Sequence, residues 1–221
     1  MREEYFQLFI DEFGEADSCK KVPGDIIDKY RGKLPDQLLG YWHTEGWCQY
    51  ANGLVWTVNP ADYEDVVHAW IYETDLESID QFYVIARSAF GNLYLCGEKI
   101  GQSITIISLT NSITGLAEEL NEKSSDEKNK SIRHFFGVSD PDDYDMEDEE
   151  GEVLFERAIQ KLGPLKDNEM YFFEPALVLG GRAKIENLQK GDIQVHLSIL
   201  RKFSAPCIAI KELNVNDYLE S

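Results

Sequence analysis

Apolar side chains recur three or four positions apart through the first seventy residues, which is the spacing of an amphipathic helix. The first such run predicts a helix over residues 3–13, ended by Gly14. The same spacing predicts further helices over residues 26–30, 35–45 and 61–70. Each of these helices has one apolar face to bury against another element of the fold.

Aromatic and β-branched residues gather in shorter runs that predict strands. Residues 47–50 and 54–58 form two such runs, joined by Ala51-Asn52-Gly53, so the sequence predicts a β-hairpin here. Three more runs, separated by glycine-containing turns, predict an antiparallel meander over residues 82–86, 92–96 and 103–109.

The second half of the chain is less regular. Residues 118–130 are polar and charge-rich, and residues 132–136 form a short amphipathic turn before an acidic run. Apolar residues at helical spacing then predict helices over 153–162 and 193–203.

These elements together indicate the α+β class, with antiparallel sheets flanked by helices. We expect two small mixed lobes that meet near residues 72–80, one formed by residues 1–75 and the other by residues 76–221. A single continuous globule is the alternative arrangement.

Composition narrows the classes of partner. Forty-one acidic residues against twenty-one basic ones give a formal net charge of −20. Such a surface repels nucleic acid and anionic membranes, whereas it attracts basic proteins. The chain has no apolar segment long enough for a membrane helix, and its first residues lack the features of an export signal. We therefore expect a cytoplasmic protein.

Four cysteines are widely separated in the sequence: Cys19, Cys48, Cys96 and Cys207. None forms a Cys-x-x-Cys pair or lies at metal-ligand spacing from a histidine. Reduced structural thiols are therefore the expectation here, in preference to disulfides or a metal site.

Catalytic motifs are not recognisable. The chain has four histidines, His43, His68, His134 and His196, and none accompanies a nucleophile elbow, a zinc-protease motif or a phosphate-binding loop. Gly180-Gly181 could cradle an anion through its amides, but a tight turn is the preferred interpretation. We expect a protein that is not an enzyme and that needs no metal or cofactor.

Residues 140–152 contain nine carboxylates and no basic side chain. One interpretation is a solvated loop that places negative charge at the first turn of the following helix. The other is a negative arm presented to a cationic cleft of a partner. On that second interpretation the candidate partner-binding residues are Asp140, Asp142, Asp143, Asp145, Glu147, Asp148, Glu149 and Glu150.

The predicted hairpin adds three candidate aromatic anchors, Trp47, Tyr50 and Trp56. Aromatic side chains dominate the binding energy of many interfaces. They also fill protein cores, and that is the expected place for most of the aromatic residues of the first lobe.

Two sets of short sequence blocks resemble known families. Gly40-Tyr41-Trp42, Glu45-Gly46-Trp47 and the segment from Gly53 to Pro60 resemble the GAD-like domain. The blocks from Ala89 to Gly97 and from Phe173 to Gly181 are similar to the C-terminal domain found in type VI secretion immunity proteins. On this resemblance, residues 1–75 would be the GAD-like domain and residues 76–221 the immunity domain.

The resemblance implies a protein that binds a cognate type VI secretion effector, with a DNase as the expected effector, and blocks its cleft or active site. The partner would be this secreted, basic toxin, bound by a monomer as a one-to-one complex. An alternative is an enzyme or small-molecule binder that uses the cleft between the lobes, with Cys96 or a histidine as the reactive group. A third possibility is a DNA mimic that regulates host proteins.

Overall fold

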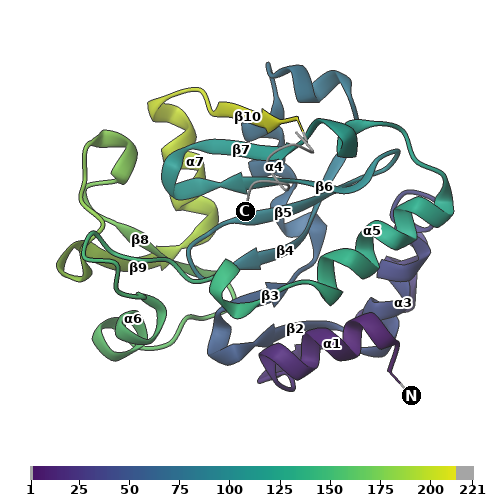
Figure 1. Ribbon diagram of the computed structural model, residues 1–221, viewed down its shortest axis with the longest axis horizontal. Helices are drawn as coiled ribbons and strands as arrows, with labels where there is room; N and C mark the ends of the chain where they lie inside the picture. Colours follow the sequence, from purple (N-terminus) through teal and green to yellow (C-terminus); the bar gives the residue numbers. More distant parts are fainter. Residues whose placement is uncertain (1, 213–221) are drawn as a thin grey trace, which may run out of the picture.

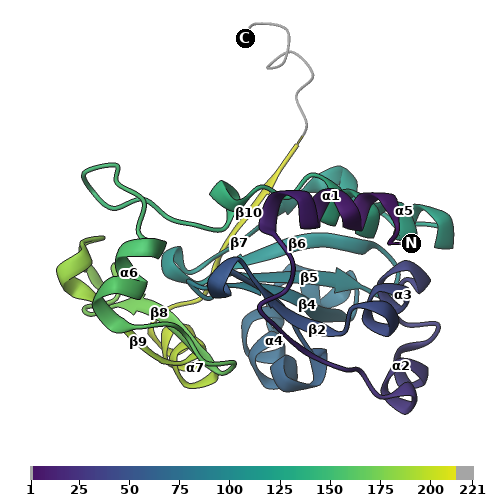
Figure 2. The same cartoon turned by 90° about the horizontal axis from the view of Figure 1, so that it is seen from below.

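Residues 2–212 are described in the computed structural model, and within them an eight-stranded sheet organises the fold (Figure 1). The strand order is β1-β2-β3-β4-β5-β6-β7-β10, and all neighbours are antiparallel except β7 and β10. Helices α1 and α5 cover one face of the sheet, and α4 and α7 lie on the other (Figure 2). The α+β class is confirmed, with a mixed sheet.

The elements of the first half of the chain follow the apolar spacing closely. The helices of this part are α1 (Glu4–Phe13), α2 (Gly24–Tyr30), α3 (Asp36–Thr44) and α4 (Glu64–Ile71). The strands are β1 (Ser18–Lys20), β2 (Trp47–Tyr50), β3 (Val55–Thr57), β4 (Phe82–Ser88), β5 (Leu93–Gly97), β6 (Gly101–Ile107) and β7 (Ser112–Leu116). The predicted helices and meander are confirmed, whereas β1 and β7 were not predicted.

The hairpin between β2 and β3 forms where the turn sequence predicts it. Asn52 and Gly53 adopt φ angles of 57° and 90°. Asparagine and glycine are the residues that tolerate this left-handed region best. The turn therefore sets a register in which Gln49 pairs with Trp56 and Tyr50 with Val55.

The rest of the chain adds helices to both faces of the large sheet, one edge strand and a second, smaller sheet. Its elements are α5 (Ser125–Gly137), α6 (Phe155–Leu162), β8 (Glu169–Phe173), β9 (Leu188–Asp192), α7 (Ile193–Phe203) and β10 (Cys207–Lys211). Strands β8 and β9 form a separate two-stranded sheet. Strand β10 then returns to pair in parallel with β7, at one edge of the large sheet.

No helix was predicted in the polar stretch over residues 118–130. Helix α5 begins within it, because Ser124 and Glu127 cap each other's backbone amides in a capping box. Its polar side chains face solvent, while Ile132 and Phe136 are buried. The helix has too few apolar positions for the spacing to reveal its first half.

The expectation of reduced cysteines was wrong for one pair. Cys19 of β1 lies directly opposite Cys48 of β2, and their sulfurs form a disulfide. The two residues are 29 positions apart, so only the strand register brings them together. Cys96 is buried as a free thiol, and Cys207 is a free, exposed one.

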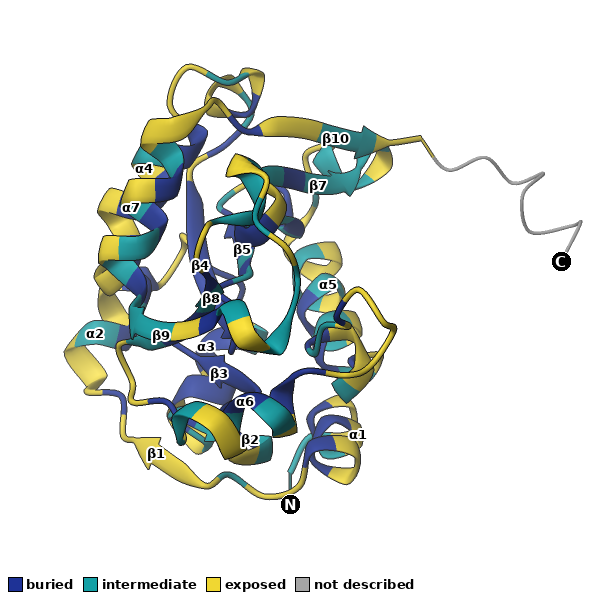
Figure 3. Cartoon of the chain, turned by 90° about the vertical axis from the view of Figure 1, so that its left-hand side faces the viewer, coloured by how far each residue is buried: buried dark blue, intermediate teal, exposed yellow. Residues whose placement is uncertain are grey.

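An aromatic cluster joins the helices of one sheet face. The ring of Phe136 in α5 lies 5.0 Å from that of Phe6 and 5.4 Å from that of Phe9, both in α1. Tyr41 of α3 and Tyr50 of β2 complete the cluster. All five side chains are buried, as is most of the sheet between the helices (Figure 3).

The expected boundary between lobes at residue 75 falls inside the large sheet. Strand β3 precedes this point and β4 follows it, and Val55 pairs with Ser88 and Thr57 with Ala86 across it. The division into residues 1–75 and 76–221 stays a prediction.

None of the helices within residues 2–212 is both long and apolar enough to cross a membrane.

We predict that Phe136→Ala lowers the free energy of unfolding by about 3–5 kcal/mol, because it leaves a cavity among the packed rings of α1, α3 and β2. The matched control is Phe203→Ala, at an exposed position of α7, which should change this free energy by no more than about 0.5 kcal/mol. Urea titration followed by circular dichroism measures both. Equal losses in the two variants would contradict the aromatic cluster as a main source of stability.

Candidate functional site

The acidic run connects α5 to α6 and is largely fixed by its own hydrogen bonds. Asp140 accepts a hydrogen bond from the amide of Asp142 at 3.0 Å and so begins a short 3₁₀ turn. Asp145 accepts from the amide of Met146 at 2.7 Å and from that of Phe155, the first residue of α6, at 2.9 Å. Burial raises the pKa of Asp145. These two carboxylates therefore shape the loop.

Asp148 is the most enclosed carboxylate of the run, with a side chain only 2% exposed. Its oxygens accept hydrogen bonds from the amides of Glu150 and Glu152, each at 3.0 Å, and from the guanidinium of Arg157 at 2.6 Å. The amide of Glu152 and the Arg157 guanidinium hold the pKa of Asp148 below its usual value. Asp148 thus closes the end of the acidic run onto α6.

Two further carboxylates pair with cations of a neighbouring loop. Glu149 accepts from Nε of Arg182 at 2.9 Å, and Glu150 forms an ion pair with Lys184 at 2.9 Å. The glycine before this cationic segment, Gly180, has a φ of 83°, so the Gly-Gly sequence makes a turn. The run and the 180–184 segment are therefore linked by charge pairs at the surface.

Three of the candidate carboxylates remain exposed and unpaired: Asp142, Asp143 and Glu147. Within residues 2–212, these side chains join no ion pair and accept no hydrogen bond. Five of the eight candidate carboxylates organise the loop, and these three are exposed to solvent. Their role in binding a partner stays a prediction.

A pocket of about 500 Å³ lies between the hairpin and the second half of the chain. Trp47, Trp56 and Tyr63 line it from one side, and Asp167 and Ile193 from the other. The third candidate anchor, Tyr50, is not in this lining, because it is buried in the aromatic cluster. Trp47 and Trp56 face a cavity rather than an open surface.

Arg87 of β4 is completely buried beside this pocket. Its guanidinium lies 4.4 Å from the ring centroid of Trp56, and Nη2 donates to the carbonyl of Asp167 at 2.9 Å. Burial lowers the pKa of Arg87. The carboxylate of Asp167 is turned instead to an ion pair with Lys20 on β1. Arg87 thereby connects the large sheet to the loop that precedes β8.

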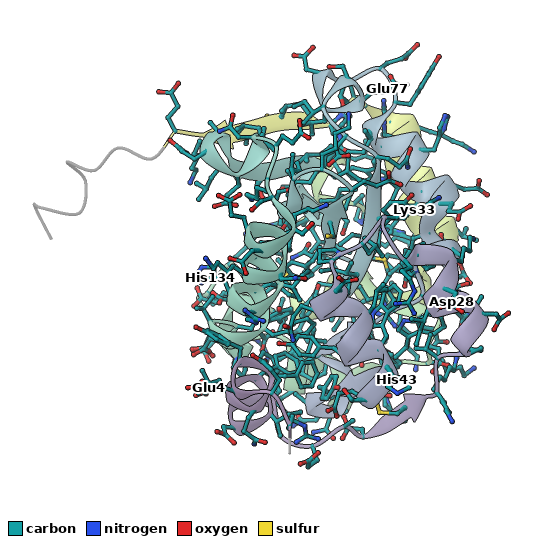
Figure 4. The ribbon with its side chains drawn as sticks, turned by 90° about the vertical axis from the view of Figure 1, so that its right-hand side faces the viewer. Glu4, Asp28, Lys33, His43, Glu77 and His134 are labelled. Atoms are coloured by element: carbon teal, nitrogen blue, oxygen red, sulfur yellow. A yellow bond between two sulfur atoms is a disulfide. The ribbon has the colours of Figure 1, made fainter. Side chains whose placement is uncertain are left out.

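The candidate reactive side chains, Cys96 and the histidines, do not line this pocket. Its lining contains no histidine, and its one cysteine, Cys19, is in the disulfide. Cys96 is buried in the sheet, and burial raises its pKa, so its thiolate is disfavoured. His43 and His134 project outward from different helices (Figure 4).

His68 and His196 stack on aromatic rings, those of Tyr72 and Phe172. Burial lowers the pKa of His196 to about 4, so it is neutral at pH 7. Within residues 2–212, no three histidine, cysteine, aspartate or glutamate side chains are grouped so as to hold a metal ion.

Two family models match the chain. The GAD-like domain matches residues 4–110, and the C-terminal domain of the type VI secretion immunity protein Tdi1 matches residues 129–204. The crystal structure of Atu4351 from Agrobacterium tumefaciens is similar, with a TM-score of 0.78 and 20% identity over 90% of this chain and 89% of that one. At that identity the similarity shows the fold alone. The search of curated proteins found no match.

We predict that Asp148→Asn destabilises the acidic run at neutral pH but not in acid. Because folding lowers the pKa of Asp148, its stabilising effect is present above the unfolded-state pKa of about 3.9 and is lost as pH falls through the folded-state value. Hydrogen exchange at the amides of Glu150 and Glu152 should be faster than wild type at pH 7. The urea midpoints of the two proteins should converge once the pH falls below the folded-state pKa of Asp148.

The control for this prediction is Asp143→Asn, which removes an exposed, unpaired carboxylate from the same loop. It should leave both amides as protected as in the wild type. Equal exchange in wild type and Asp148→Asn at pH 7 would show that Asp148 does not close the loop.

Proposed function

We infer that this chain, which matches the GAD-like domain over residues 4–110 and the C-terminal domain of the type VI secretion immunity protein Tdi1 over residues 129–204, is itself an immunity protein. We propose that it binds one cognate effector, a DNase, and inhibits it by blocking its cleft or active site. The cytoplasm of the cell that makes both proteins is where this inhibition takes place. The match of residues 129–204 to the Tdi1 domain carries this proposal.

Charge supports the choice of a nuclease as the effector. A DNase presents positive charge along its cleft, because it binds a chain of phosphates. This protein has a net charge of −20, so the two molecules attract each other before they touch. The exposed carboxylates of Asp142, Asp143 and Glu147 strengthen that field on the domain matched to Tdi1.

Inhibition by stoichiometric binding fits the chemistry of the side chains better than catalysis does. The buried thiol of Cys96 and the neutral, stacked His196 lie outside the pocket beside Arg87. Arg87 itself donates to main-chain carbonyls, as a structural arginine does. The protein acts on the effector through its surface.

The second candidate function is binding of a small molecule in the pocket lined by Trp47, Trp56 and Tyr63. Its volume of about 500 Å³ is typical of ligand pockets, and it lies between the two matched segments. A ligand there would bridge β1 and the loop before β8. Inhibition of the effector by protein dialysed free of small molecules would favour the first function.

We predict that an equimolar amount of the purified chain abolishes DNA cleavage by the purified nuclease domain of the effector encoded beside it. Binding should be stoichiometric, because an immunity protein must leave no active effector. Plasmid cleavage measured against inhibitor concentration, with isothermal titration calorimetry for the ratio, tests this. Undiminished cleavage at a tenfold excess of the chain would reject the proposed function.

We also predict that neutralising the three free carboxylates slows association with that nuclease domain. The triple variant Asp142→Asn, Asp143→Asn, Glu147→Gln should associate about two- to fivefold more slowly at low salt. The difference should shrink as salt rises, since the Debye length is only ~8 Å at physiological ionic strength. Stopped-flow fluorescence at several salt concentrations measures these rates.

The matched control removes three exposed carboxylates from other elements: Glu12→Gln, Asp25→Asn and Glu122→Gln. It changes the net charge equally, so it separates the effect of the acidic run from that of total charge. Identical rates in the two triple variants would show that the run acts only through total charge.

A further inference from the structure

Helix α7 exposes an apolar stripe to solvent. Val195, Ile199 and Phe203 are 58%, 42% and 49% exposed, and they lie four positions apart on one face of the helix. The opposite face is buried through Ile193, Leu197 and Leu200, so α7 needs no second apolar face for folding. A stripe of this kind commonly marks an interaction surface.

The stripe borders a groove of about 530 Å³ between α7 and the start of α4. Val195 and Ile199 form one wall, and three acidic residues, Asp62, Glu64 and Asp65, line the other. Nε2 of Gln194 donates to the carbonyl of Asp62 at 2.6 Å and so holds the two walls together. Lys202 is the one cation of the lining.

The groove depends on both matched segments. Helix α4 belongs to the segment matched to the GAD-like domain, and α7 belongs to the segment matched to the Tdi1 domain. The two helices lie side by side on one face of the sheet (Figures 2 and 3). The indole nitrogen of Trp70 in α4 donates to the carbonyl of Leu197 in α7 at 3.3 Å, and Arg201 donates to the carbonyl of Ala69.

We propose that this groove and the exposed stripe of α7 form the surface that holds the effector. The occupant is an apolar side chain of the effector's nuclease domain, flanked by lysine or arginine side chains that meet Asp62, Glu64 and Asp65. This assignment rests on the proposed function. It places the main contact on the sheet face opposite α1 and α5, away from the acidic run that follows α5 (Figure 2).

Charge selects this occupant over a second copy of the chain. Two copies would each bring a net charge of −20, and the acidic wall would face acidic neighbours. A nuclease, in contrast, supplies cations that such a wall attracts. An apolar centre with a charged rim is also the usual composition of a specific interface, in which the centre carries most of the binding energy.

The test uses the full chain with Val195→Ser and Ile199→Ser, and the purified nuclease domain of the effector encoded beside it. Dissociation of the complex should be about 10- to 100-fold faster than for wild type, because the apolar centre of the contact is removed. The association rate should change little. Biolayer interferometry gives both rates, and circular dichroism with urea titration confirms that the variant is folded.

The matched control carries Leu8→Ser and Val138→Ser, two apolar residues that are 45% and 58% exposed. Leu8 is on α1 and Val138 directly follows α5, so both lie with the helices of the opposite sheet face. This variant should dissociate within about twofold of wild type. A second pair of variants reverses single charges. Asp65→Lys, in the groove, should weaken binding to the nuclease domain, and Asp25→Lys, outside the groove, should weaken it less.

The outcomes separate the surface from the function. Wild-type kinetics in the Val195→Ser, Ile199→Ser variant, with intact inhibition by wild type, would overturn this surface and leave the proposed function standing. Failure of wild-type protein to bind the nuclease domain would overturn both. A wild-type dimer in light scattering that becomes a monomer in the variant would assign the stripe to self-association, also against the proposal.

Discussion

The burial of one aromatic layer between the large sheet and the helices α1, α3 and α5 is the interaction on which the rest of the structure depends. Phe6, Phe9 and Phe136 bring together residues more than 120 positions apart in the chain. Once α5 is held there, the acidic run must leave from the same face. The layer therefore decides where the most charged segment of the protein lies.

Negative charge is the second constraint, and the fold pairs some of the carboxylates with donors while it leaves others exposed. In the acidic run, carboxylates that would repel one another are separated by backbone amides, by Arg157 and by the 180–184 loop. The exposed ion pairs stabilise the fold little, since solvent screens them. Asp148 differs, because its enclosed carboxylate would leave several donors unpaired if removed. Part of the acidic run therefore stabilises the loop, and the rest of it is exposed to solvent.

Periodicity predicted much of this fold and little of its long-range pairing. The helices from α1 to α4, the hairpin and the meander each carry their own local signal, so residue spacing was enough to find them. Strand β10 was missed because its partner, β7, lies about 95 residues earlier, and no local pattern encodes that parallel pairing. The Cys19–Cys48 disulfide was missed for the same reason, since it depends on the register of β1 against β2.

The candidate site shows the same limit at the level of single side chains. Sequence placed Asp148 and Asp142 in one acidic run, but only packing buries the first and leaves the second free. Helical spacing does separate the two faces of α7, because positions 193, 197 and 200 alternate with 195, 199 and 203. What spacing cannot say is which face the protein itself covers.

That choice is made by α4. The indole nitrogen of Trp70 donates to the main-chain carbonyl of Leu197, and Arg201 donates to the carbonyl of Ala69. These bonds hold the Leu197 side of α7 against α4, and the Val195 face stays open. Because α4 and α7 come from separately matched segments, neither segment alone would present the groove. An acidic wall from one segment and an apolar wall from the other then form a single surface. Pairing of the two segments in one chain is thus a condition for the recognition proposed here.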